Sequence, residues 1–276
     1  MVEAPRIRIT YDTVKFTKNR IIISASGATY KKAQIDLVGY RLKKWWFAGK
    51  YIYLYLIKNS SEYVCRTHMM MYGRIIVNNS QAYPNLTPFL ILKLDDNTTL
   101  TWYLSQIKFL DPNCETDIIK TNYSICSSRK NIADSFKLMK YDVSNDSYDP
   151  VLHLKHLIKG ISEYRSEILV DFLLDQQYFP GVGNILQQEI LYRCRLSPTK
   201  KIFEFGSGIK LKKILVCIIK QLKELVDTLY QSYLGTRTGK ILQIYHKSVC
   251  PLGHKTTTKY LGFRRRKTTW CPICQE

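Results

Sequence analysis

The chain has 276 residues, with 42 Lys and Arg against 22 Asp and Glu, which gives a formal charge of +20. This length buries an ordinary core without disulfides, in one large domain or, as we favour, in two medium ones. The charge exceeds what solubility requires and indicates a polyanionic partner, although a merely soluble basic surface is the alternative. Nucleic acid fits better than a membrane surface, because the basic residues are spread along the chain rather than gathered on one amphipathic helix.

Targeting signals are not evident in the sequence. No run of 18 apolar residues occurs, and the first six residues lack an apolar signal core. We therefore expect a soluble intracellular protein, with the choice between cytoplasm and nucleus left open. Of the eight cysteines, five have no regular spacing, which predicts reduced thiols and one metal site instead of a disulfide framework. These five are Cys65, Cys114, Cys126, Cys194 and Cys217.

The first half of the chain, from Ile7 to Leu110, is rich in β-branched and aromatic residues and predicts short strands. We expect a sheet-rich domain over residues 1–140, and a hairpin turn at Asp95–Asn97. The expected strands are Arg20–Ser24, Tyr51–Ile57, Tyr63–Met69, Ile75–Val77, Phe89–Leu94 and Thr98–Leu104.

After this region, residues 141–150 are polar, lack a sustained period and are expected to form a linker. Apolar residues then recur at helical spacing, which predicts a helical domain over 151–245. Its one strong interruption is Phe179–Asn184, where a proline and two glycines end one helix before another starts at Asn184. With a finger at 246–276, the expected fold class is multi-domain α+β, with a β-sandwich as the N-terminal domain and a helical C-terminal domain that ends in the finger.

The metal site is predicted at the C-terminal end. Cys250 and His254 form one close pair, Cys271 and Cys274 form the other, and residues 255–270 separate the pairs. Each close pair places two ligands on a tight turn, and the spacer is long enough for a β-hairpin that joins them in a tetrahedron. Four protein ligands close the site, so we expect one structural zinc ion and no catalytic cofactor.

Two segments resemble the Fpg/Nei family, formamidopyrimidine-DNA glycosylase and endonuclease VIII. Phe179–Ile185, followed by Glu189, is similar to the helix-two-turn-helix of that family, in which Asn184 contacts a phosphate. The finger resembles the family's zinc finger, whose arginine at the hairpin tip corresponds to Arg266. The family usually has four cysteine ligands, and His254 in place of the second is compatible with zinc.

The N-terminus carries the third resemblance. The family has Met-Pro-Glu there, and its nucleophile is the α-amino group of residue 2 after Met1 is removed. Here Val2 and Glu3 follow Met1, as in the Nei-like branch with an N-terminal valine. The change is compatible with the chemistry, because an α-amine has a pKa of about 7.7 to 8.0 and is in substantial part a free amine at neutral pH.

Further positions are carried over from the resemblance one at a time. Gly49–Tyr51 matches the family's Gly-Lys-Tyr, so Lys50 is expected at a phosphate near the damaged nucleotide and counted with the catalytic residues. His68–Gly73 is similar to His-Leu-x-Met-Ser-Gly, which makes Met71 the residue inserted into the stack and His68 a backbone contact. Met70 is then expected to be core filler.

Two departures qualify the resemblance. Arg6 stands where the Fpg type usually has glutamate, and Ile107–Leu110 stands where the family has Arg-x-Phe-Gly, so only Phe109 remains of the wedge that faces the orphaned base. An enzyme without that arginine is expected to discriminate weakly between opposite bases and to act well on single-stranded DNA.

The resemblance implies a monomeric bifunctional DNA glycosylase and AP lyase that acts on DNA with damaged bases or abasic sites. The Val2 amine forms a Schiff base, Glu3 acts as general acid, and β-elimination cuts the strand, with δ-elimination left open. Oxidised pyrimidines and hydantoins are inferred as substrates from the Nei-like branch. The alternatives are a non-enzymatic damaged-DNA or single-strand binding protein on the same fold, and a transcription factor with a base-reading helix in its finger.

Overall fold

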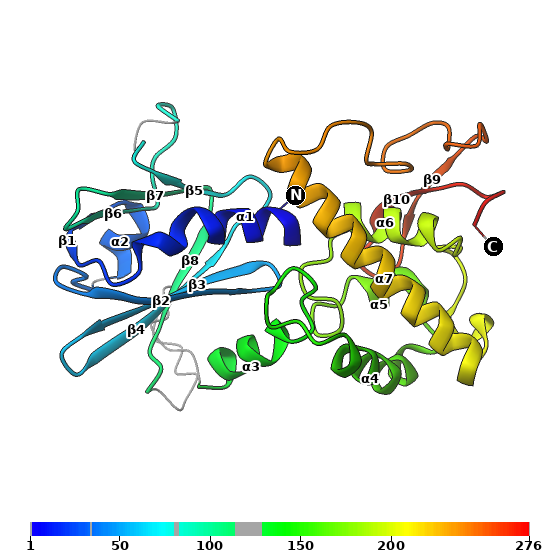
Figure 1. The fold of residues 1–276 in the computed structure, drawn as a ribbon, viewed down its shortest axis with the longest axis horizontal. Helices are drawn as coiled ribbons and strands as arrows, with labels where there is room; N and C mark the ends of the chain where they lie inside the picture. The colour runs from blue at the N-terminus through cyan, green and yellow to red at the C-terminus, as the bar shows by residue number, and fades with distance from the viewer. Residues whose placement is uncertain (1, 34, 80–82, 114–128, 276) are drawn as a thin grey trace. The chain divides into compact units, whose positions relative to one another are not determined.

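The computed structural model describes residues 2–33, 35–79, 83–113 and 129–275 (Figure 1). The chain divides into two compact units. Unit 1 comprises Met1–Val2 and Arg6–Lys137, and unit 2 comprises Glu3–Pro5 and Leu138–Glu276. The division lies close to the expected end of the first domain, but it assigns Glu3–Pro5 to unit 2, which no local sequence pattern indicates.

Unit 1 contains two antiparallel four-stranded sheets. One has the order β1-β6-β7-β5 and the other has the order β2-β3-β4-β8. The strands are β1 Ile22–Ser26, β2 Arg41–Ala48, β3 Tyr51–Lys58, β4 Ser61–His68, β5 Arg74–Val77, β6 Leu90–Leu94, β7 Thr99–Tyr103 and β8 Gln106–Leu110.

The two sheets bury one common core. In β3, every second side chain from Ile52 to Leu56 is fully buried, as expected for a strand with one face in a core. The same hydrophobic cluster includes Ile22 and Leu92 from the other sheet. Trp102 crosses between the sheets, since its Nε1 donates to Thr67 Oγ1 at 3.1 Å. The predicted N-terminal β-sandwich is confirmed, as is the hairpin turn at Asp95–Asn97 between β6 and β7.

The strand prediction was wrong at the start of the chain, where Ala4–Val14 forms helix α1. Ile7, Tyr11 and Val14 recur at helical spacing, and Ile7 and Val14 are fully buried, so the tertiary core selects a helix despite the β-branched residues. The prediction also missed β2 and β8, whose basic and aromatic residues obscure the alternation. The other helices of unit 1 are η1 Lys15–Thr17, α2 Ala28–Ala33 and α3 Arg129–Met139, the last of which ends beyond the unit boundary.

Unit 2 is helical, as predicted, up to its last hairpin. Its largest hydrophobic cluster includes Phe172, Phe179, Leu186 and Leu222. Asp149 caps the first helix by accepting hydrogen bonds from the backbone N–H groups of Val151 and Leu152. The elements are α4 Pro150–Gly160, η2 Ile161–Tyr164, α5 Leu169–Leu173, α6 Asn184–Arg193, η3 Ile202–Phe205, α7 Gly208–Tyr233, β9 Thr257–Leu261 and β10 Arg266–Trp270.

Two further segments of unit 2 are residues 141–150 and the finger. Residues 141–150, expected as a linker, belong to unit 2, where Asp142 and Ser144 are buried and hydrogen-bonded to each other. The finger is a β-hairpin of β9 and β10, with no helix between residues 246 and 275. This contradicts the alternative of a base-reading helix in the finger. Among the described residues, no helix is long and apolar enough to cross a membrane.

Candidate active site and metal centre

The carboxylate of Glu3 lies at the N-terminus of α6. Its Oε1 accepts a hydrogen bond from Ile185 N at 2.9 Å, and its Oε2 accepts one from Leu186 N at 3.1 Å. Glu3 is only 5% exposed although it is acidic. The first N–H groups of a helix have no partner within the helix and carry its positive dipole end, so they stabilise negative charge here. Glu3 is therefore held rigidly, 182 residues away in sequence from the helix that binds it.

The two glycines before α6 allow this approach. A Cβ at Gly183 would lie 2.3 Å from Glu3 Oε1, and a Cβ at Gly181 would lie 2.7 Å from the Cβ of Ala4. Gly181 also has a φ of +81°, which favours glycine. Its carbonyl accepts a hydrogen bond from Ala4 N at 3.0 Å. The Pro-Gly-Val-Gly turn, predicted to approach a phosphate, thus first accommodates the chain's own residues 3 and 4.

Tyr245 of unit 2 lies within electrostatic reach of this carboxylate. Burial, and to a smaller extent the charge of Glu3, raises the pKa of Tyr245. Its backbone is fixed by Glu189, a fully buried carboxylate on α6 that accepts hydrogen bonds from the N–H groups of Gln243, Ile244 and Tyr245. The sequence singled out Glu189 but gave no signal for this role, because the bonds join α6 to a segment more than 50 residues away.

Val2 belongs to unit 1 and is 8% exposed, in the hydrophobic cluster of that unit. The residue that would provide the amine is therefore anchored by its side chain. A frayed terminus, the ordinary expectation for the start of a chain, does not describe residue 2.

Lys50 and His68 meet at one end of the β2–β3–β4–β8 sheet. Lys50 follows Gly49 in the turn between β2 and β3, and Tyr51 pairs with His68 across the strands. Burial lowers the pKa of His68, and the positive charges of Lys50 and Arg66 lower it further. His68 Nδ1 accepts a hydrogen bond from Met70 N at 3.2 Å. The two residues expected at phosphates are thus close neighbours in a positively charged environment.

The methionine triplet forms an exposed turn after β4. Met70 and Met71 are 50% and 55% exposed, whereas Met69 is 1% exposed in the core. The prediction that Met70 fills the core was wrong; Met69 has that role. The turn closes through Gly73 N, which donates to Met69 O at 2.7 Å. Met71 is therefore displayed to solvent, as a residue that inserts into a base stack must be.

The four predicted metal ligands converge. The potential ligand atoms of Cys250, His254, Cys271 and Cys274 all lie within 4.8 Å of one another. Cys250 Sγ and Cys274 Sγ are 3.9 Å apart, close to the separation of about 3.8 Å that Zn–S bonds of about 2.3 Å give in a tetrahedron. Soft thiolates with one imidazole suit zinc, and four of them leave no position for water.

The cysteines that the structure describes outside this cluster are not among its potential metal ligands. Cys65, Cys194 and Cys217 are free in the structure, as predicted, while Cys114 and Cys126 lie outside the described residues. The cluster at the C-terminal end thus remains the metal-binding group of the described chain.

The finger is docked onto the helices by residues that sequence reasoning missed. Gln188 on α6 accepts a hydrogen bond from Thr269 N at 2.7 Å and donates to Lys267 O at 3.1 Å. At the hairpin turn, the buried carboxylate of Asp171 on α5 accepts one from Phe263 N at 3.2 Å. Their sequence neighbourhoods are ordinary helix, and only the docked hairpin reveals their role.

Asn184 and Arg266 lie at this junction. Asn184 is the first residue of α6, and its Nδ2 donates to Lys267 O at 3.0 Å, which ties it to the strand that begins at Arg266. The Oδ1 atom of Asn184 is buried without a hydrogen-bond partner in the described chain. Arg266 is exposed and forms no ion pair among the described residues.

The expected wedge position is buried. Phe109 lies in β8, is 3% exposed and belongs to the core of unit 1, opposite Cys65. A side chain packed in this core is not available to DNA in this conformation, so its position gives no support to a DNA contact by Phe109, which stays a prediction. The comparison with the family motif did not consider that alternate residues of a strand face the core, so it gave no sign that Phe109 is buried.

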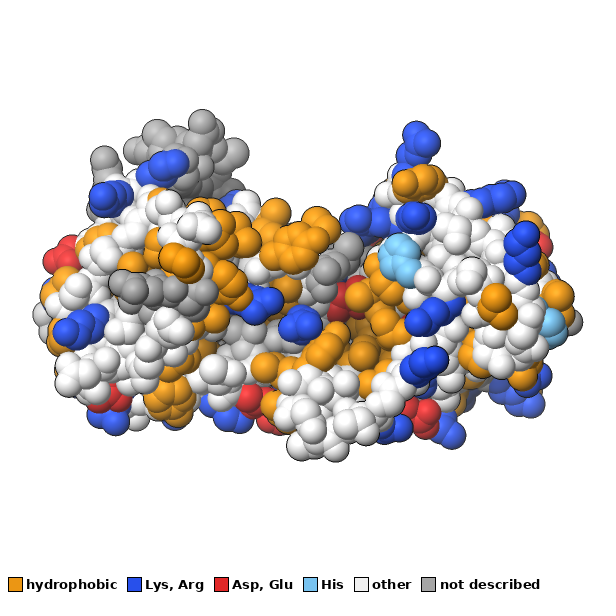
Figure 2. Space-filling model, turned by 90° about the horizontal axis from the view of Figure 1, so that it is seen from above, with side chains coloured by type: hydrophobic (Ala, Val, Ile, Leu, Met, Phe, Trp, Pro, Cys, Tyr) orange, Lys and Arg blue, Asp and Glu red, His pale blue; other side chains and the backbone are white. Residues whose placement is uncertain are grey.

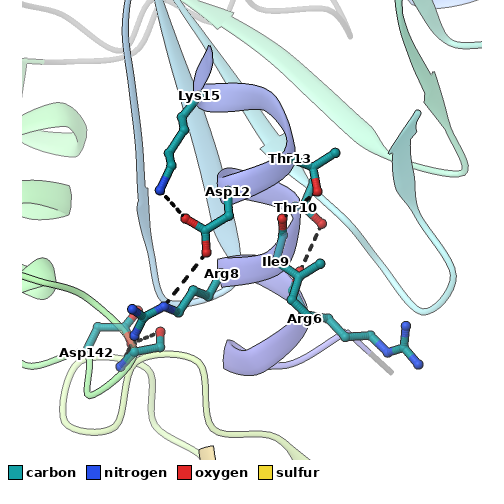
Figure 3. Close-up of polar contacts among 9 residues, drawn as sticks. Arg6, Arg8, Ile9, Thr10, Asp12, Thr13, Lys15 and Asp142 are labelled. Atoms are coloured by element: carbon teal, nitrogen blue, oxygen red, sulfur yellow. Dashed lines mark hydrogen bonds and ion pairs between the residues drawn. The ribbon is translucent and has the colours of Figure 1, made fainter. Parts of the chain in front are cut away.

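Arg6 lies on the first turns of α1, where its carbonyl accepts a hydrogen bond from Thr10 Oγ1 (Figure 3). Its side chain points away from the cluster on the other side of the helix, in which Asp12 pairs with Arg8 and Lys15 (Figure 3). On the face drawn in Figure 2, Lys and Arg side chains are spread over both units and acidic side chains are few. The formal charge of the sequence is therefore displayed at the surface.

The chain was compared with known proteins. It is 54% identical over 280 residues to endonuclease 8-like L720 of Acanthamoeba polyphaga mimivirus, and the match covers all of both chains. The chain belongs to the Fpg/Nei family of DNA glycosylases. It is thus a DNA glycosylase of base excision repair, and the resemblance seen in its motifs is confirmed. No family model matches the chain.

Solved structures agree with this membership. The crystal structure of a viral DNA glycosylase has a TM-score of 0.90 at 54% identity over all of both chains. Lactococcus lactis formamidopyrimidine-DNA glycosylase bound to DNA with an abasic site has a TM-score of 0.70 at 16% identity over 99% of both chains, which shows the common fold. Endonuclease 8-like 2 of Bos taurus is 37% identical over 106 residues, which are 37% of this chain and 30% of that protein.

Proposed function

We propose that this DNA glycosylase is also an AP lyase, with the α-amine of Val2 as nucleophile and Glu3 as the proton-transferring acid. The observation that carries the proposal is the position of Glu3, whose carboxylate is held by Ile185 N and Leu186 N at the start of α6. A buried acid directly after an N-terminal residue with an anchored side chain provides two adjacent groups with different tasks.

The reaction begins with the damaged nucleotide out of the base stack, at a cost of a few kcal/mol that is smaller where pairing is already weak. The Val2 ammonium gives a proton to the Glu3 carboxylate and becomes a free amine. The amine attacks C1′ of the sugar while the Glu3 carboxyl protonates the ring oxygen. The C1′–O4′ bond breaks and the ring opens, which leaves Val2 attached to C1′ as a secondary ammonium and Glu3 as a carboxylate. The ammonium gives a proton to the base, and the C1′–N bond to the base breaks. The base leaves with the bonding electron pair, while the lone pair of the Val2 nitrogen forms the C=N bond.

The product is an iminium between Val2 and C1′. Its positive charge acidifies the proton on C2′, and loss of that proton expels the 3′ phosphate by β-elimination. Hydrolysis of the iminium with water then restores the amine. In the ionised state between these steps, the Glu3 carboxylate is stabilised by the two N–H groups of α6.

The other proposed contacts hold the DNA. Lys50 and His68 contribute positive charge and hydrogen bonds to phosphates next to the damaged nucleotide, and Met71 fills the gap in the stack. Asn184 and Arg266, which the junction of α6 and β10 brings together in unit 2, contact phosphates on either side. Zinc is the proposed metal, held by Cys250, His254, Cys271 and Cys274; it takes no chemical part and fixes the hairpin that carries the arginine.

The proposed substrates are oxidised pyrimidines and hydantoins, in single-stranded as well as double-stranded DNA. The residues that align with the family's wedge, Ile107–Leu110, lie in a strand and contain no arginine, which supports weak discrimination between opposite bases. A panel of lesion oligonucleotides, each as a single strand and as a duplex with four opposite bases, tests this part of the proposal.

The chemistry is tested by trapping with borohydride on abasic DNA. We expect a covalent adduct in which the peptide that begins at Val2 carries the reduced sugar, identified by mass spectrometry. A matched protein with an uncleaved extension before Val2 should bind the DNA and give no adduct. An adduct on a lysine side chain, or full activity with the extension in place, would refute the N-terminal amine.

A further inference from the structure

The outer face of the β2–β3–β4–β8 sheet carries aromatic and basic side chains beyond His68 for which the proposed active site has no role. This face lies opposite the core, because its side chains alternate with buried residues such as Ile52 and Leu54. The strand register places three rows of side chains across it. The outer face comprises Ala48, Tyr51, His68 and Gln106, then Trp46, Tyr53, Arg66 and Lys108, then Lys44, Tyr55, Val64 and Leu110.

Aromatic rings are stacked along this face. Trp46 stacks on Tyr53 with ring centroids 5.0 Å apart, and Phe136 of α3 stacks on Trp46 at 5.2 Å. The indole N–H of Trp46 donates to Ser135 Oγ at 3.0 Å, which fixes α3 in place. Trp46 and Tyr53 are buried below, while Phe136 is 39% exposed. The ring of Phe136 at the end of the stack is thus partly exposed, with Trp46 stacked on it and the Lys44 ammonium over it.

Positive charges surround the stack without acidic partners. Arg66 lies directly opposite Lys108 across β4 and β8, and Lys44 is 5.1 Å above the ring of Phe136. None of these three cations forms an ion pair among the described residues. Like charges opposite each other destabilise a sheet, so this arrangement has a stability cost that an anionic ligand would remove.

Acidic groups also lie near the face: Asp134 on α3 pairs with Lys137 at 3.7 Å, and Glu62 lies at the far end of the face. Glu62 on β4 is hydrogen-bonded to the Tyr55 hydroxyl, one row beyond Val64. At the opposite end the face reaches His68, one of the proposed phosphate contacts, and the Arg66 guanidinium lies 5.1 Å over the ring of Tyr51 beside it. The positive charge therefore runs from the proposed DNA contacts toward Phe136.

We propose that the outer face binds single-stranded DNA that flanks the lesion, with phosphates along Arg66, Lys108 and Lys44 and an unpaired base stacked on Phe136. Cations beside an exposed, fixed aromatic ring are the combination by which proteins bind single strands without reading their sequence. A duplex fits poorly, because its bases are already stacked and hidden from the ring. The inference rests on the proposed DNA substrate and is independent of the amine chemistry.

The experiment compares DNA substrates that differ in the length and the strandedness of the DNA beside the lesion. Fluorescence anisotropy measures the binding of the full chain to a short single strand around an abasic-site analogue, to the same strand with a long single-stranded extension, and to a duplex extension of equal length. The variants are Arg66→Gln with Lys108→Gln, and Phe136→Ala. The matched control is Lys212→Gln with Lys213→Gln, which removes two exposed cations from α7.

We expect the single-stranded extension to strengthen binding of the wild type. The Arg66 and Lys108 double variant should lose most of that gain, and its salt slope on the extended strand should fall by about 1.4, at about 0.7 for each phosphate contact on a single strand. Phe136→Ala should weaken binding of the extended strand about fivefold, the lower end for one stacked base. The control should retain the gain.

Three results would overturn the inference: no gain from the extension, an equal gain from the duplex, or an equal loss in the control. Thermal unfolding of the double variant gives a second check, since relief of like-charge repulsion should leave it at least as stable as the wild type. Borohydride trapping on the short strand should be unchanged in all variants. Failure of trapping in the wild type itself would refute the amine chemistry and leave the length comparison valid.

Discussion

Gly183→Ala tests directly whether the position of Glu3 controls the chemistry. The backbone of Gly183 has a φ of −128°, which alanine adopts without strain, so the effect of the added methyl group is steric. The new Cβ would lie 2.3 Å from Oε1 and 2.6 Å from Cδ of Glu3. Restoring an ordinary contact requires the carboxylate to move by about 1 Å, and a misplacement of that size costs about 100-fold in rate.

The same displacement weakens the two hydrogen bonds from the N–H groups of Ile185 and Leu186 to the carboxylate. Hydrogen bonds to charged groups contribute about 1.5 to 3 kcal/mol each, so a partial loss should destabilise the fold by about 2 kcal/mol. For a chain of this size that is a fall of about 4 to 8 °C in the midpoint of thermal unfolding.

The assay is single-turnover cleavage and borohydride trapping at saturating enzyme, well below the unfolding temperature. Gly208→Ala is the control, because its Cβ would meet nothing within 4 Å while its φ of +55° makes alanine unfavourable there. The control should lose about 1 kcal/mol of stability and keep its rate. A wild-type rate for Gly183→Ala, or an equal rate loss in Gly208→Ala, would refute the argument from Glu3.

Further predictions concern the acid, the finger and the metal. Glu3→Gln should abolish base excision while DNA binding, measured by anisotropy, persists. Arg266→Ala should weaken duplex binding and reduce its salt slope by about 0.9, the value for one phosphate contact. Burial raises the pKa of Asp171, so the folded state binds a proton there more tightly than the unfolded state does. The stability of the wild type relative to Asp171→Asn should therefore fall as the pH rises from the ordinary pKa of an aspartate to the raised pKa of the folded state. Removal of the metal with a chelator should unfold the finger and reduce DNA affinity, with recovery on adding zinc.

Each of these measurements has an outcome that would contradict the role assigned to the acid, the finger arginine, Asp171 or the metal. Base excision that survives in Glu3→Gln would move the acid to another residue, and an unchanged salt slope in Arg266→Ala would mean that the finger does not grip DNA. The comparison at Asp171 includes its charged neighbours: Glu167 raises the pKa and Arg264 lowers it. Parallel stability curves for both proteins would show that the Asp171 carboxyl does not titrate differently on folding. A finger that stays folded without metal would contradict a structural zinc site.

The local patterns of the sequence determined much of this protein. Cys250, His254, Cys271 and Cys274 have a spacing that depends on two tight turns and a hairpin, all of which form from neighbouring residues. The glycine turn before α6 and the long apolar period of α7 are equally local. Motifs of this kind are readable because the residues that satisfy them lie within a few positions of one another.

Only the tertiary structure decided how the distant segments meet. Ile7 and Val14 form a helix because the core of unit 1 accepts one face of it, and Phe109 points into that core because of the register of β8. Glu3 finds its N–H partners in a helix that starts 181 residues later, and Asp171 finds its partner in the finger. Such contacts depend on burial and on hydrogen bonds across the fold, and a one-residue change of strand register reverses which side chains they involve. The sequence therefore specified the reactive groups, and the packing of unit 2 fixed where the acid stands.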